Sequence, residues 1–172
     1  MELGWNIFPW VAAVVFALSL TSAVTALRNH ERSNIAIACS TTAIALFMLF
    51  IASLWMTLER PPLRTMGETR LWYSLFMLLA GLFTYMRWQF RWILSFSTLL
   101  ATVFMVINIL KPEIHDQTLM PALQSIWFVP HVSVYMFSYA LLGCATILAI
   151  GALATRSDKF DEAIERLVYG GV

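Results

Sequence analysis

The fold is decided by one uninterrupted apolar stretch, IAIACSTTAIALFMLFIASLWMTL, which occupies residues Ile35–Leu58. The stretch contains no charged residue, and its only clearly polar positions are Cys, Ser and Thr. A helix needs about 20 consecutive and mainly apolar residues to cross the hydrocarbon core of a bilayer. Because the stretch exceeds that length, it predicts a transmembrane helix.

The composition of the whole chain indicates a membrane protein. Of its 172 residues, 60% are apolar and 12% are charged, whereas a soluble domain carries about 25% charged residues. This excludes a soluble globular protein and a disordered one. The formal net charge of +1 leaves no basic field for nucleic acid. Cys39 and Cys144 lie in apolar runs and form no CxxC pair, so neither a disulfide framework nor a zinc site is predicted.

Four further stretches predict membrane spans, at residues 9–27, 66–86, 92–110 and 130–155. Thr65 and Glu68 have the spacing of a capping box, so the helix that contains the second of these is expected to begin near Met66. No Gly- or Ser-rich linker and no internal repeat divides the chain. We therefore expect one all-α unit over residues 1–172, a polytopic membrane bundle with about five transmembrane helices.

Two shorter elements complete this prediction. Residues 121–129 are too short to span a bilayer and predict an interfacial helix at the outer surface. Residues 158–169 follow a candidate N-cap at Ser157 and place Phe160, Ile164 and Leu167 on one face, which predicts an amphipathic tail helix. This tail either lies on the cytoplasmic surface of the membrane or leads into a further span.

The distribution of Lys and Arg predicts the orientation. Seven of these residues follow the first span, lie between the third and fourth spans, or lie in the tail. The other four lie on the opposite side: Arg60, Arg64, Arg70 and Lys111. Since cytoplasmic segments carry the excess of positive charge, we expect the N-terminus outside and the C-terminus in the cytoplasm. The two longer outside segments, residues 59–70 and 111–129, are then the expected location of function.

The spans contain no Asp, Glu, Lys, Arg or His away from their ends. Pumps, ion channels and proton-coupled transporters normally need such residues within the membrane. Their absence argues against those classes and against a b-type cytochrome, which needs facing histidines within the bilayer.

His131 is the most informative residue of the sequence. It lies in the first turn of the last span, and Tyr135 and Tyr139 share its face because they follow at intervals of four residues. Trp127 lies just upstream. A neutral imidazole among aromatic rings is suited to ligate haem iron, but the same pattern fits a histidine in an interfacial aromatic belt. His30 and His115 are interpreted as solvated loop residues.

Arginines on the outer side form a second candidate group. Arg60, Arg64 and Arg70 are suited to bind an anion such as a haem propionate. The alternative is that Glu59, Glu68 and lipid phosphates neutralise them.

Two segments resemble CcsA/ResC-type proteins of System II cytochrome c maturation. Residues 62–74, PLRTMGETRLWYS, are similar to the outer-loop motif of that family, with Thr69 at a position where the usual form has serine. Residues 119–133, LMPALQSIWFVPHVS, together with Tyr139-Ala140, are similar to the segment around the first external histidine of the family.

The resemblance implies a haem-handling role in the inner membrane of a bacterium. With a ResB-type partner, such proteins move haem b across the membrane and attach it to apocytochrome c as part of a haem lyase. The resemblance implies that His131 is an axial haem ligand, flanked by Trp127, Tyr135 and Tyr139, with Arg64 and Arg70 as secondary candidates for propionate contacts.

The chain also departs from the family pattern. It contains no Trp-Asp dipeptide, which marks the tryptophan-rich haem-binding segment of the family, and it ends at Val172. By this comparison it corresponds to the N-terminal part of such a protein, and we expect it to be inactive alone. A ligand-free membrane scaffold remains the alternative interpretation.

Overall fold

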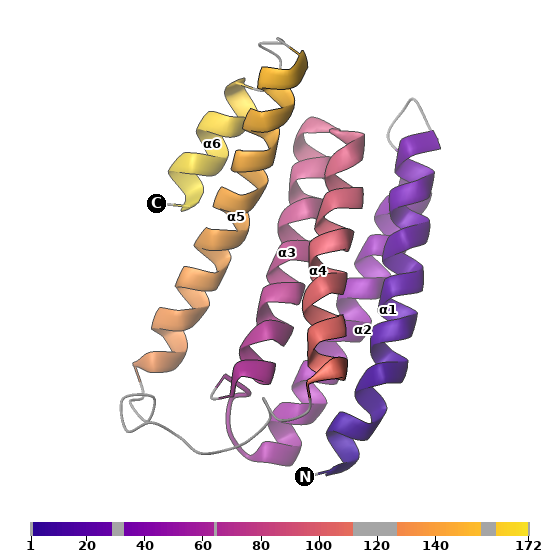
Figure 1. The fold of residues 1–172 in the computed structure, drawn as a ribbon, viewed down its shortest axis with the longest axis vertical. Coiled ribbons are helices and arrows are strands. Elements are labelled where there is room, and N and C mark those ends of the chain that lie inside the picture. Colours follow the sequence, from indigo (N-terminus) through magenta and orange to yellow (C-terminus); the bar gives the residue numbers. More distant parts are fainter. Residues whose placement is uncertain (1, 29–32, 64, 112–126, 156–160, 172) are drawn as a thin grey trace.

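The computed structural model describes residues 2–28, 33–63, 65–111, 127–155 and 161–171. The described residues form six helices and no strand. Four of them, α1 (Glu2–Arg28), α2 (Asn34–Leu58), α3 (Met66–Trp88) and α4 (Arg91–Leu110), run up and down as an elongated bundle (Figure 1). In that bundle α1 packs on α2 and α4, and α3 packs on α2 and α4. The all-helical bundle predicted from the sequence is therefore confirmed.

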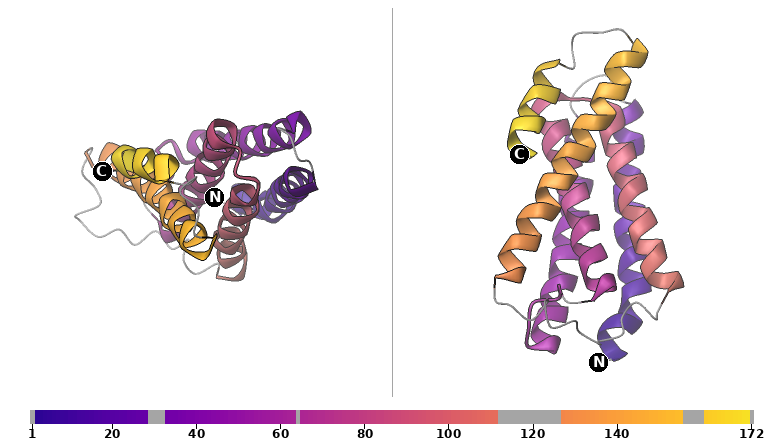
Figure 2. Two further views of the ribbon diagram at one scale, coloured as in Figure 1. Left: turned by 90° about the horizontal axis from the view of Figure 1, so that it is seen from above. Right: turned by 60° about the vertical axis from the view of Figure 1, so that its left-hand side comes forward.

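The last two helices lie on one side of this bundle. Helix α5 (Phe128–Thr155) crosses α3 at a tilt, and α6 (Asp161–Gly171) runs back along α5 (Figures 1 and 2). The amphipathic tail helix is confirmed over Asp161–Gly171, whereas Ser157 and Phe160 lie outside the described residues. Its apolar face packs into the protein, since Leu167 is buried in the same cluster as Leu141 and Leu148 of α5. The tail therefore lies along α5 instead of across the end of the bundle, where a helix on the membrane surface would lie.

Among the described residues, four helices are long and apolar enough to cross a membrane: α1, α2, α4 and α5. Helix α3, which was predicted as a fifth span, is long enough with 23 residues, but it is not apolar enough to count as a membrane span by composition. Twelve of its residues are buried against its neighbours. A central helix presents less of its surface to lipid, so its polar residues are tolerated where they face other helices.

The beginning of α3 follows the sequence prediction closely. Thr65 caps the helix by accepting a hydrogen bond from the Glu68 amide at 3.1 Å, and the Glu68 carboxylate accepts one from the Thr65 amide at 3.2 Å. This reciprocal pair satisfies two amides that the helix itself leaves without acceptors. Met66 is the first residue of α3, as predicted.

Small polar residues join the helices inside the bundle. The hydroxyls of Ser22 and Ser40 lie 2.6 Å apart, and Ser22 donates to the carbonyl of Ala36 at 2.7 Å. Asn108 of α4 donates to the carbonyl of Gly67 at 2.9 Å. Such hydrogen bonds between helices contribute to association where the hydrophobic effect is weak, as within a bilayer.

The expected outer interfacial helix, residues 121–129, lies mostly outside the described residues. Phe128 and Val129 belong to α5, which therefore begins two residues before the predicted Pro130.

Candidate haem-binding face at the start of helix α5

The structure places His131 in the first turn of α5. Helix α5 begins at the lower end of the molecule in Figure 1. Its amide donates to the carbonyl of Trp127 at 3.3 Å, so the helical hydrogen bonds begin at Trp127. The His131 side chain is exposed. A residue held by helical backbone but open to its surroundings is suited to present an imidazole to a ligand.

Three aromatic rings follow one another along this face of α5. The His131 ring meets Tyr135 edge to face, with centroids 4.5 Å apart at 76°, and Tyr135 lies 6.0 Å from Tyr139. All three side chains are exposed, and Trp127 is 77% exposed. The structure therefore places His131, Tyr135 and Tyr139 side by side on one face of α5. Trp127 lies one turn earlier and is joined to His131 by the backbone hydrogen bond.

The neighbouring helices add aromatic residues that the sequence analysis missed. Tyr73 of α3 is close enough to Tyr139 for an electrostatic interaction. Tyr73 stacks on Phe104 of α4 at 5.7 Å and 23°. Phe76 of α3 meets Phe137 of α5 edge to face at 6.0 Å. These pairs depend on how the helices cross, which no local sequence pattern contains.

Arg60 does not belong to the binding face, because its guanidinium is already neutralised. It forms a two-pronged ion pair with Glu68, with N–O distances of 2.9 and 3.0 Å. The Glu68 side chain is 2% exposed and that of Arg60 is 17% exposed. For Arg60 the alternative interpretation, neutralisation by an acidic neighbour, is therefore correct.

Arg70 differs from Arg60. Its Nη1 atom is buried and has no hydrogen-bond partner among the residues that the structure describes. Glu68, the acidic residue closest to it in sequence, binds Arg60. Arg70 therefore has a donor that no described residue satisfies, and its contact with an anion stays a prediction. Arg64, His30 and His115 lie outside the described residues.

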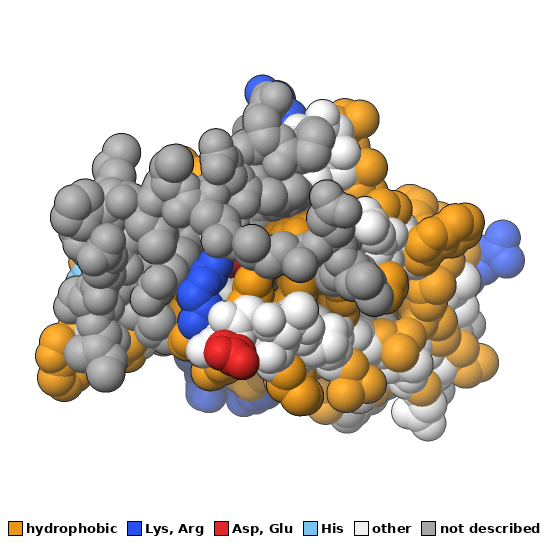
Figure 3. Space-filling model, turned by 90° about the horizontal axis from the view of Figure 1, so that it is seen from below, with side chains coloured by type: hydrophobic (Ala, Val, Ile, Leu, Met, Phe, Trp, Pro, Cys, Tyr) orange, Lys and Arg blue, Asp and Glu red, His pale blue; other side chains and the backbone are white. Residues whose placement is uncertain are grey.

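The segment before α3 is held firmly at the lower end of the bundle. The Trp72 indole donates to the carbonyl of Pro62 at 2.9 Å, and Leu63 is fully buried. Figure 3 shows this lower end, where Lys and Arg side chains lie next to the part of the surface drawn in grey.

The residues of this face fit haem as a ligand. The described residues contain no group of three or more His, Cys, Asp or Glu side chains that would bind a free metal ion. A single accessible imidazole beside aromatic side chains is suited to haem iron, which takes one ligand from a histidine. A guanidinium with an unsatisfied buried donor is suited to bind a carboxylate.

Comparisons with known proteins agree with this chemistry. Residues 63–170 match the family model described as "Cytochrome C assembly protein". The chain is 26% identical over 163 residues to the cytochrome c biogenesis protein CcsA of Cucumis sativus, which covers 90% of this chain and 50% of that protein. It is 33% identical over 108 residues to the same-named protein of Pelargonium hortorum, covering 60% and 34%.

The match to the protein of that name in Oenothera argillicola is 32% identical over 95 residues, covering 54% of this chain and 30% of that protein. The chain thus spans half or less of the length of these curated relatives. No solved structure matches it. Because the family model covers well over half of the chain, including Arg70 and His131, the chain belongs to the cytochrome c assembly protein family.

Proposed function

We propose that this chain contributes a haem-binding site to cytochrome c assembly, with His131 as an axial ligand at the lower end of α5. Haem b is the cargo that this site receives and that is then attached to apocytochrome c. The proposal extends the family assignment, which gives a role in cytochrome c biogenesis, to a particular site and ligand.

The observation that supports this proposal most strongly is the exposure of the His131 side chain on an aromatic face of α5. The side chain is exposed, and its ring meets that of Tyr135 edge to face. A ring nitrogen of neutral imidazole is a common ligand of haem iron. The helix fixes the Cα position and Tyr135 restricts the ring, so the imidazole needs little reorganisation to bind.

The surrounding side chains have complementary roles in this proposal. Tyr135, Tyr139 and Trp127 offer flat apolar surface for packing against a porphyrin. Arg70 offers a donor for a propionate. When haem is bound, a ring nitrogen of His131 would coordinate its iron.

We further propose that the lower end faces outward and that the chain acts with a ResB-type membrane partner in a bacterial inner membrane. The sequence supports this orientation, because seven Lys and Arg residues lie in the segments predicted to be cytoplasmic and four lie in those predicted to be outside. The ResB-type partner follows from the family resemblance, as does the haem lyase reaction to which the chain would contribute. Because the chain spans half or less of the length of its relatives, we propose that the complete reaction requires the whole assembly and not this chain alone.

The test is haem content after purification of the chain in detergent, measured by absorbance. We expect wild-type protein to carry haem, His131→Ala to lose it, and added imidazole to restore part of it. His115→Ala, a histidine outside the proposed site, is the matched control and should retain the wild-type content. Equal haem content in wild type and His131→Ala would refute the assignment. A chain that carries no haem but co-purifies with a ResB-type partner would favour a ligand-free scaffold.

A further inference from the structure

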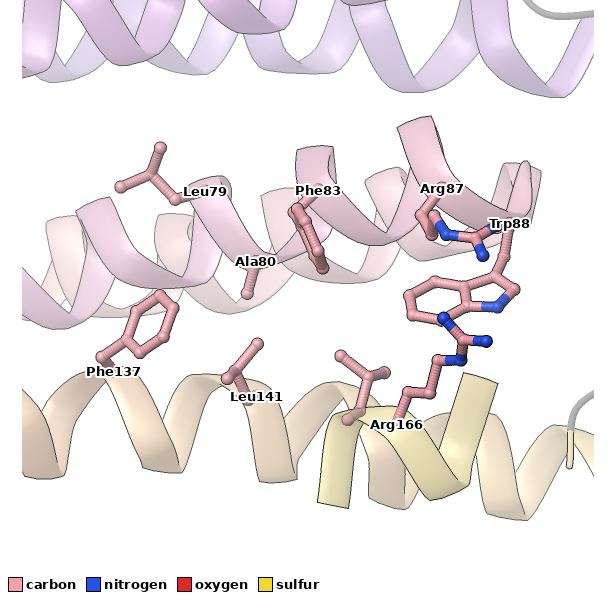
Figure 4. Close-up of a pocket in the computed structure, with 9 residues that line it drawn as sticks. Leu79, Ala80, Phe83, Arg87, Trp88, Phe137, Leu141 and Arg166 are labelled. Carbon is pink, nitrogen blue, oxygen red and sulfur yellow. The ribbon is translucent and has the colours of Figure 1, made fainter. Parts of the chain in front are cut away.

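A cavity of about 500 Å³ lies between α3, α5 and α6 in the upper half of the molecule. Its volume falls within the range of small-molecule sites, roughly 300–1,000 Å³. Figure 4 shows α3 on one side of the cavity and α5 with α6 on the other. Its apolar wall consists of Leu79, Ala80, Phe83, Phe137, Leu141 and Leu167. This cavity does not include the residues of the proposed haem site.

One end of the cavity is basic. Arg87 at the end of α3 places its guanidinium over the Trp88 ring, 5.4 Å from the ring centroid. Arg166 reaches the same place from α6, and Figure 4 shows both guanidinium groups beside the Trp88 indole. Both arginines are exposed, and none of the described residues that line the cavity is acidic. The cavity therefore combines a long apolar wall with two positive charges at one end.

This polarity matches the position of the cavity in a membrane protein. Arg and Trp at the end of a membrane-spanning bundle lie at the level of lipid headgroups. The apolar wall runs from there along α3 and α5, and Phe83 and Phe137 are 55% and 44% exposed. A molecule in this cavity would thus have an apolar part in contact with hydrocarbon and an anionic part at the interface.

We propose that the cavity binds an anionic phospholipid, with its phosphate at Arg87 and Arg166 and an acyl chain along the apolar wall. Basic pockets between membrane helices are suited to anionic headgroups. A zwitterionic lipid would bring a positive group to the same end. An apolar helix of another protein would cover the wall but offer no anion to the guanidinium groups. The charge of the site therefore favours the anionic lipid.

The experiment measures thermal unfolding of the full chain, purified and delipidated in detergent, while phosphatidylglycerol or phosphatidylcholine is added. Phosphatidylglycerol should raise the unfolding temperature at lower concentrations than phosphatidylcholine. Each basic residue near a membrane surface is expected to change the affinity for anionic lipid by about fivefold. Arg87→Gln/Arg166→Gln should therefore weaken the effect of phosphatidylglycerol by about 25-fold. Both side chains are exposed, so the variant should fold normally.

Arg28→Gln is the matched control. Arg28 is exposed and ends α1 at the same end of the bundle, but it does not line the cavity. This variant should respond to phosphatidylglycerol as the wild type does. Three results would overturn the proposal: equal responses to the two lipids, an equal loss in Arg28→Gln, or full competition by soluble glycerol phosphate. The last would indicate a phosphate site without a place for an acyl chain.

Discussion

Glu68 takes part in two interactions at the lower end of the bundle. Its carboxylate both completes the capping box with Thr65 and pairs with Arg60, and its side chain is almost fully buried. Glu68→Gln preserves the size and an acceptor for the cap but removes the negative charge. We expect a loss of about 1–3 kcal/mol in the free energy of unfolding, because Arg60 is left as a largely buried charge without its counterion.

Circular dichroism of the helices during thermal unfolding in detergent measures this loss. Glu59→Gln serves as the comparison, since Glu59 is exposed and lies at the end of α2. It should leave the unfolding temperature unchanged. If the two variants are equally stable, the Arg60–Glu68 pair does not hold this segment.

The spacing of residues in the sequence predicted some of these contacts but not others. The interval from Thr65 to Glu68 predicted the cap, and the intervals of four from His131 to Tyr139 predicted the shared face. The partner of Arg60 was not predictable, because Glu59 and Glu68 both lie near it in the sequence and only the fold shows which carboxylate it meets. The unsatisfied donor of Arg70 likewise depends on the tertiary structure.

Helices α3 and α4 pack so closely that Gly81 has no room for a side chain. A Cβ added at Gly81 would overlap the side chain of Ser97. Gly81→Ala should therefore destabilise the bundle by about 1–3 kcal/mol, the usual range for overpacking. The double variant Gly81→Ala/Ser97→Gly should recover much of this loss. Thermal unfolding of the single and double variants measures both effects.

Gly143 in α5 offers a matched control for this prediction. A Cβ there would meet only the terminal methyl of Met77, at the ordinary contact distance of 3.7 Å. Gly143→Ala should be neutral or slightly stabilising, since alanine favours helix more than glycine does. Similar losses in Gly81→Ala and Gly143→Ala would indicate that helix contact at Gly81 is not the cause.

At the scale of elements, apolar runs predicted the helices but not their packing. Helices α2, α3 and α4 begin within a residue of the predicted positions. Helix α1 instead begins at Glu2, seven residues before the predicted start at Pro9, and Pro9 lies inside it. The apolar face of the tail correctly predicted a helix, but the same face is suited to a membrane surface and to α5, and only the tertiary structure distinguishes them. Likewise, the polar residues of α3 are explained by its central position, which its own sequence does not reveal.

The two ends of the whole molecule have different chemistry. The lower end carries the aromatic face of α5 and Arg70, and the upper end carries Arg87 and Arg166 beside an apolar cavity. Charge asymmetry of this kind determines the orientation of membrane proteins. We therefore expect the lower end to lie outside the cytoplasm.

Labelling of single cysteines in intact cells tests this orientation. In a variant without Cys39 and Cys144, cysteine replaces either exposed Lys111 at the end of α4 or exposed Glu165 on α6. An impermeant reagent should label only the variant at position 111, and both should be labelled after the cells are broken. The reverse pattern in intact cells would invert the topology and place His131 in the cytoplasm.

The His131 imidazole is proposed to bind haem iron, and the spectrum of the His131→Cys variant tests this binding without intermediate steps. Replacing a nitrogen donor by a thiolate changes the electronic structure of the iron. If position 131 supplies the ligand, the absorption and electron paramagnetic resonance spectra of the variant should shift from those of an imidazole-ligated to those of a thiolate-ligated haem. Wild-type spectra at wild-type haem content would show that the iron is bound elsewhere and would contradict the claim.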